Sequence, residues 1–64
     1  MNRYHLKIVS IASLILETVV EADLVGWSEA GLYEFVKTNN GKREVIAYYP
    51  VDKTIIEKIE YNIQ

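Results

Sequence analysis

Residues 31–50 read GLYEFVKTNNGKREVIAYYP and contain the strongest structural signal in the chain. Two runs rich in aromatic and β-branched residues, 32–38 and 43–49, flank Asn39, Asn40 and Gly41. Asn and Gly accept the positive φ angles of tight hairpin turns, and Asn-Gly between such runs predicts a β-hairpin. Since an isolated hairpin is only marginally stable in water, the rest of the chain must supply strands or a helix that cover it.

Length and composition limit the chain to one small domain. Its 64 residues include no cysteine, so neither a disulfide nor a thiolate metal site is available to stabilise it. A chain of this size buries only about 60% of its unfolded surface, yet half of these residues are hydrophobic. We therefore expect a single domain over residues 1–64, with some apolar surface buried against another subunit or protein. The lack of cysteine fits a reducing compartment, and we expect a cytoplasmic protein.

The charge is small overall but unevenly distributed. The formal net charge is −2, and no Lys or Arg occurs between Lys7 and Lys37, where five acidic residues lie. Nucleic-acid-binding proteins neutralise phosphates with clustered Lys and Arg, and this chain has no surplus of them. The distribution favours a solvated, mildly acidic surface.

The first 22 residues have the outline of a secretory signal, because basic residues precede an apolar run at 8–16. Ser10 and Ser13 interrupt the run, and loss of the segment would leave a remainder too short to fold easily without a disulfide. We instead expect residues 4–16 to form a strand of the domain, buried on both faces because apolar residues occupy both parities. The run is too short to span a bilayer, and no membrane association is expected.

A tight reversal is expected at Glu17 and Thr18, followed by a strand over residues 19–27. The buried face of this strand would carry Val20, Ala22 and Leu24. The solvent-exposed face would carry Glu21, Asp23 and Val25. Gly26 inside this strand predicts a bulge or a close backbone approach. The alternative is a helix over residues 10–22, since Ser10, Ser13, Glu17 and Glu21 recur at helical spacing.

Beyond the central hairpin, Pro50 ends a strand because it has no N–H to donate. Residues 51–53 form a short turn, and residues 54–63 alternate well enough to be a closing strand. A helix over 54–63 competes, because Thr54 and Glu57 have the form of a capping box. The sequence thus predicts an all-β fold, a small antiparallel meander or partly open five-stranded barrel. The alternative is an α+β fold in which helix 10–22 or 54–63 packs on a hairpin sheet.

Four or five short strands, with Tyr49 and Pro50 before a one-turn connector and a last apolar strand, resemble the small SH3-like and Sm-like barrels. RNA-binding Sm-like proteins carry Asp and Asn between their second and third strands, where this chain has SEAG at 28–31. They also carry a basic or Gly-containing motif near the last strand, where this chain has TIIE at 54–57. The resemblance therefore implies the barrel fold without the RNA site.

No pattern of residues predicts catalysis, and we expect no enzymatic activity, cofactor or metal. His5 is the sole histidine and lies next to the N-terminus, without the nucleophile and orienting group that a hydrolytic triad needs. Glu17, Glu21 and Asp23 form the one acidic group with the spacing for a hard cation. Alternation along a wet strand face produces the same pattern without any chemistry.

Aromatic residues are the strongest indication of function. The set is too large for so small a core, so part of it must face water or a partner: Trp27, Tyr33, Phe35, Tyr48 and Tyr49. Tyr and Trp concentrate binding energy in protein interfaces, although cross-strand packing would explain them equally well. We expect a non-enzymatic protein-interaction or self-associating module. The alternative is a single-stranded nucleic-acid binder that uses Lys37, Lys42 and Arg43 beside the tyrosines.

Overall fold

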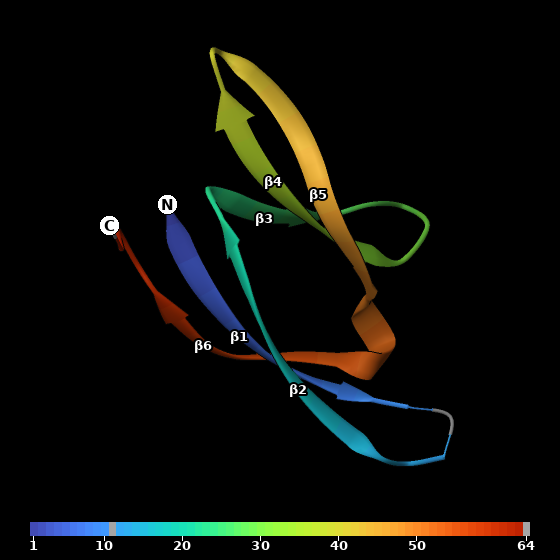
Figure 1. The fold of residues 1–64 in the computed structure, drawn as a ribbon. Coiled ribbons are helices and arrows are strands. Elements are labelled where there is room, and N and C mark those ends of the chain that lie inside the picture. The colour runs from blue at the N-terminus through green and yellow to red at the C-terminus, as the bar shows by residue number, and fades with distance from the viewer. Residues whose placement is uncertain (11, 64) are drawn as a thin grey trace.

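The computed structural model describes residues 1–10 and 12–63 (Figure 1). Ile11, which we expected on one face of the first strand, and Gln64 lie outside the described residues. The described residues form six strands and one 3-10 turn: β1 (Asn2–Val9), β2 (Ile15–Ala22), β3 (Leu24–Trp27), β4 (Leu32–Asn39), β5 (Lys42–Pro50), η1 (Val51–Lys53) and β6 (Thr54–Glu60). The all-β prediction is confirmed. Helices over 10–22 or 54–63 are wrong, because β2 and β6 occupy these segments.

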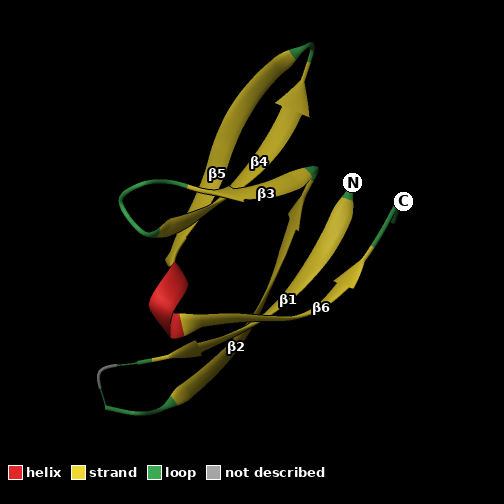
Figure 2. Ribbon diagram, turned by 180° about the vertical axis from the view of Figure 1, so that it is seen from behind, coloured by secondary structure: helices red, strands yellow, loops and turns green. Residues whose placement is uncertain are grey.

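The strands form two antiparallel sheets of three, in the orders β2-β1-β6 (the first sheet) and β3-β4-β5 (the second sheet). The chain crosses between them twice, from β2 into β3 and from β5 through η1 into β6 (Figure 2). In the described residues the two sheets do not close into a barrel, and the expected five strands are six. No helix in this part of the chain has the length and hydropathy needed to traverse a bilayer.

The central hairpin is confirmed as β4 and β5, which pair from Leu32 opposite Pro50 to Asn39 opposite Lys42. Its turn has φ of 53° at Asn40 and 78° at Gly41, as the Asn-Gly signal predicts. The ladder contains one irregularity, in which β5 carries an additional residue, Ile46, opposite the step from Phe35 to Val36.

The first reversal lies earlier than we expected. The Ser10 N–H donates to the Leu14 carbonyl at 2.8 Å, the Ser10 hydroxyl accepts from the Leu14 N–H at 3.2 Å, and Ser13 has φ of 60°. The predicted turn at Glu17 and Thr18 is therefore wrong, since both residues lie inside β2. The physical reason is that a serine side chain can satisfy backbone groups locally, which favours a turn within an otherwise apolar run.

The predicted strand over 19–27 is divided at Asp23, where the chain leaves the first sheet for the second. The Asp23 N–H donates to the Val36 carbonyl at 2.8 Å, and its carboxylate accepts from the Thr38 N–H at 2.7 Å. This switch reverses the expected face of Val25, which packs against the core. The bulge predicted at Gly26 is wrong, because Gly26 pairs regularly with Glu34 and no described residue approaches its missing Cβ within 4 Å.

The core lies between the two sheets and consists of Tyr4, Leu6, Val20, Ala22 and Phe35. Phe35 is fully buried and meets Tyr4 and Tyr49 edge-to-face, with ring centroids 5.2 and 5.8 Å apart. Burial of residues 4–16 on both faces is wrong. Leu6 is 2% exposed whereas Leu14 and Leu16 are 64% and 56% exposed, because the β1–β2 hairpin extends past the second sheet (Figure 1).

Candidate functional site

The five predicted aromatic residues do not form one surface. Phe35 is the centre of the core, and Tyr33 and Tyr49 are half-buried against it. Trp27 and Tyr48 are 77% and 57% exposed. Only these two of the five are available to a partner without a change in packing. Packing within the fold accounts for the other three.

The register also separates the two exposed aromatic residues. Trp27, Tyr33 and Tyr49 lie side by side in one row, on the face of the second sheet that carries Phe35. Tyr48 pairs with Glu34 and therefore points to the opposite face. A partner that contacts Trp27 on one face of the second sheet would therefore not reach Tyr48 on the other face.

The predicted basic group lies at the free end of the central hairpin. Lys42 adjoins the turn, Arg43 lies opposite Thr38 in the register, and Lys37 lies opposite the acidic residue Glu44. Lys37 lies four positions along the strand from Tyr33, a distance of about 13 Å. The basic residues and the tyrosines therefore lie at different ends of the sheet and do not form a single stacking platform.

The three carboxylates considered for a cation are dispersed. Glu17 and Glu21 lie on the outer face of β2, whereas Asp23 bonds to the Thr38 N–H and lies 3.7 Å from the N-terminal ammonium group. No group of three His, Asp or Glu side chains within the described ranges could hold a metal ion.

The outer face of the first sheet carries a ladder of alternating charge. Arg3 on β1 bridges the two outer strands, with its guanidinium 3.0 Å from a Glu21 carboxylate oxygen and 3.1 Å from one of Glu60. The His5 ring nitrogen Nε2 lies 3.2 Å from the other Glu60 oxygen. The basic central strand is thus neutralised by an acidic strand on each side.

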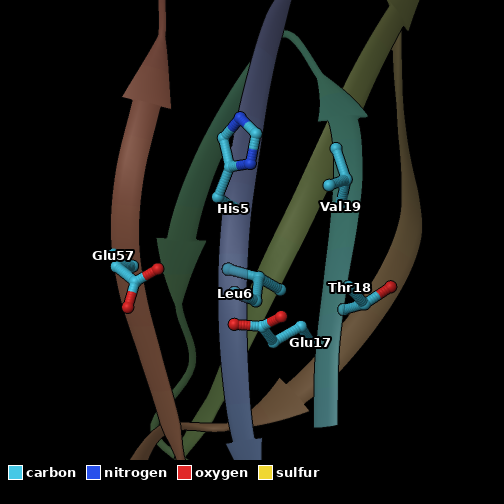
Figure 3. Close-up of a pocket in the computed structure, with 6 residues that line it drawn as sticks. All are labelled: His5, Leu6, Glu17, Thr18, Val19 and Glu57. Atoms are coloured by element: carbon cyan, nitrogen blue, oxygen red, sulfur yellow. The ribbon is translucent and has the colours of Figure 1, made fainter.

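Lys7 continues this ladder and borders a shallow depression. Its Nζ lies 2.8 Å from Glu57 and 3.9 Å from Glu17, on the two strands that flank β1. The depression beside them has a volume of about 230 Å³ and is lined by His5, Leu6, Glu17, Thr18, Val19 and Glu57 (Figure 3). Because its charged groups already pair through Lys7, we interpret it as a solvated part of the charged face.

Ion pairing shifts the pKa of three ladder residues. The hydrogen bond with His5, with Lys58 and Arg3 nearby, lowers the pKa of the Glu60 carboxyl below its ordinary value. The hydrogen bond to Glu21 raises the pKa of the Arg3 guanidinium, and that to Glu57 raises the pKa of the Lys7 ammonium. All three shifts favour the charged forms, so the ladder stabilises the folded state near neutral pH.

The lowered pKa of Glu60 predicts an acid-dependent loss of stability. A carboxyl with a depressed folded pKa stabilises the fold above its unfolded pKa, about 4.3, and loses this contribution as pH falls through the folded value. We expect Glu60→Gln to lower the melting temperature slightly at pH 7 and to reduce the further loss between pH 5 and pH 3. Thermal melts of Glu60→Gln and of a control, Glu29→Gln, in a turn outside the ladder, would measure this. Equal acid dependence in both variants would contradict the role of Glu60.

The sequence analysis missed a group of neighbouring exposed apolar side chains at the border of the first sheet. Four side chains in β2 and directly before it are exposed by 64%, 63%, 56% and 49%, namely Leu14, Ile15, Leu16 and Val19. We refer to these four residues as the β2 apolar edge. The sequence signal was the apolar run at 8–16, which places apolar residues on both parities and which we interpreted as burial within one chain.

The chain was also compared with known proteins. No protein-family model matches it, and neither the curated proteins nor the solved structures include a significant match.

Proposed function

We propose that the protein is a non-enzymatic protein-interaction module whose binding surface is the β2 apolar edge. One observation carries the proposal: three consecutive residues, Leu14, Ile15 and Leu16, are each more than half exposed at the border of a sheet. Consecutive residues of a strand point to opposite faces, so this border is apolar on both sides. A strand of this kind is a template for pairing with another chain.

Comparison of the sheet borders supports β2 as the binding edge. Proteins protect exposed edges with short strands, bulges, charges or proline. In the described residues, β3 has only four residues, β5 carries a bulge at Ile46 and ends at Pro50, and β6 carries a bulge at Glu57. The β1–β2 register has no such shift, and the first residues of β2 carry no charge.

The fold alone does not separate a binding role from a catalytic one. Two features support a likeness to partly open SH3-like barrels. The chain turns at Asp23 from β2 in one sheet into β3 in the other, and a 3-10 turn precedes β6. Small β folds of this kind host many functions, so the role must come from the surface. The absence of cysteine supports a reducing compartment such as the cytoplasm.

Single-stranded nucleic acid remains the alternative ligand, with weaker support. Lys37, Lys42 and Arg43 lie at the far end of the hairpin from Tyr33 and Tyr49, and Tyr48 points to the other face. We therefore expect no retardation of a labelled oligonucleotide at low salt, where the phosphate contribution is strongest. Retardation that weakens as salt is added would favour the alternative.

Site-specific photo-cross-linking would test the proposed surface. A benzophenone amino acid replaces Leu14 on the β2 apolar edge or, as the matched control, Tyr48 on the second sheet, which is similarly exposed. In cells that produce the protein, we expect a discrete covalent adduct with a polypeptide from position 14 and none from position 48. Equal labelling at the two positions, or none at position 14, would refute the proposed surface.

A further inference from the structure

The proposed function leaves the partner open, and the geometry of β2 identifies one. We infer that the β2 apolar edge binds a second copy of this chain, with β2 antiparallel to β2 of the partner copy about a two-fold axis at Leu16. The first sheets of the two copies would then join into one sheet of six strands. This inference rests on the proposed function.

The direction of the free backbone groups on β2 follows from one hydrogen bond and the register. The Ser10 N–H bonds to the Leu14 carbonyl, so Leu14 points its backbone groups toward β1, and alternation gives the same direction to Leu16 and Thr18. The odd-numbered residues of β2 therefore point their N–H and C=O groups outward. Asp23 agrees with this alternation, because its N–H bonds away from β1, to β4.

Outward groups define which pairings with a second copy are possible. Ile15, Glu17 and Val19 offer their backbone N–H and C=O groups to an added strand, and no further strand of the described residues pairs with this edge. In a two-fold antiparallel pair both copies contribute the same residues, so the outward N–H and C=O groups of one copy can bond to those of the other. The remaining question is the residue at which the axis passes.

Like charges exclude two registers, and the turn disfavours a third. An axis at Glu17 would place Glu17 opposite its own copy, and an axis at Val19 would place Glu17 opposite Glu21 twice; like charges directly opposite destabilise a sheet. Because Ser13 has φ of 60° and is not extended, an axis at Ile15 would confine the ladder to residues 14–16 with one hydrogen-bonded pair, whereas an axis at Leu16 keeps residues 14–18 with two. Axes at Leu16 and Thr18 remain.

Burial decides between the last two registers. An axis at Thr18 would place Leu16 opposite Val20 and Leu14 opposite Ala22, which are only 7% and 0% exposed and have little surface left to bury. An axis at Leu16 places the two exposed Leu16 side chains opposite each other. On that face the row of Ile8 and Leu16 continues into Leu16 and Ile8 of the other copy. The contact thus removes exposed side chains of the β2 apolar edge from water, and burial of apolar surface is the main driving force for association.

Disulfide formation between single introduced cysteines would test the pairing. The chain contains no cysteine of its own, so no other disulfide can form between two copies. At the axis, two Leu16→Cys side chains would lie within disulfide distance. Two Thr18→Cys or Val19→Cys side chains would be about 13 or 20 Å apart. Under mild oxidation we expect a covalent dimer from Leu16→Cys alone on a non-reducing gel. A dimer from Thr18→Cys or Val19→Cys, with none from Leu16→Cys, would overturn the register.

Light scattering across a concentration series provides the second measurement. We expect the unsubstituted chain to show twice the monomer mass at high concentration, and Leu16→Lys to halve it while circular dichroism stays unchanged. Ile55→Lys is the matched control, because Ile55 is also 56% exposed but lies on β6, at the opposite border of the first sheet; it should remain dimeric. A monomer at every concentration, without a Leu16→Cys product, would overturn the inference. If position 14 still labelled a different polypeptide in cells, the proposed function would stand.

Discussion

Phe35→Ala is expected to lower the melting temperature by about 12–40 °C, enough to leave much of the chain unfolded at 37 °C. Phe35 has no exposed surface, and its ring contacts Tyr4 from one sheet and Tyr49 from the other. Replacement of a buried Phe by Ala costs about 3–5 kcal/mol. At about 0.05–0.15 kcal/mol per residue, a chain this small has only about 3–10 kcal/mol of stability, and each kcal/mol corresponds to about 4–8 °C.

Urea unfolding followed by circular dichroism at one protein concentration would measure the loss. Tyr48→Ala is the matched control, since it also removes an aromatic ring from the second sheet, but one that is 57% exposed. We expect that control to change the free energy of unfolding by no more than about 0.5 kcal/mol. Similar losses in the two variants would show that Phe35 is not the centre of the core.

Leu6→Ala is expected to destabilise the fold and Leu16→Ala to weaken self-association, although both remove the same atoms from the same face of the first sheet. Leu6 is 2% exposed and touches the core, so its truncation should cost about 2–5 kcal/mol in the free energy of unfolding. Leu16 is 56% exposed, so its truncation should leave the stability of one chain nearly unchanged. Its effect should instead appear in self-association.

Two measurements separate these effects. Urea unfolding at low concentration, where association is negligible, should show a large loss for Leu6→Ala and almost none for Leu16→Ala. Light scattering at high concentration should show a weaker dimer for Leu16→Ala. A large loss of stability from Leu16→Ala in the dilute chain would mean that Leu16 is buried, contrary to the structure.

The β2 apolar edge accounts for part of the high apolar content of this small domain. Half of the residues are hydrophobic, yet the two sheets bury only a small central cluster. Among the described residues, four of the ten large apolar side chains that are exposed lie together at the β2 border, which has neither the shortness of β3 nor the bulges of β5 and β6. This concentration favours a specific contact, since contiguous exposed apolar patches on soluble proteins usually mark interaction sites.

The sequence by itself determined the features that depend on neighbouring residues. The turn at Asn40 and Gly41 was predictable because few residues accept two successive positive φ angles. Pro50 likewise marked the end of β5, since a missing N–H interrupts any ladder. At 54–63 the local pattern was compatible with both a strand and a helix. Only the pairing of β6 with β1 shows that it is a strand, and a local pattern cannot predict that pairing.

The tertiary structure alone decided which apolar residues are inside. Leu6 and Leu16 are equivalent in sequence pattern, but only Leu6 lies beneath the second sheet, because the chain changes sheets at Asp23 and leaves the end of the first hairpin uncovered. The same applies to Phe35 and Trp27, which share a face of the second sheet with opposite burial. Periodicity assigns a side chain to a face, whereas burial requires a second surface against that face, and only the arrangement of the two sheets supplies it.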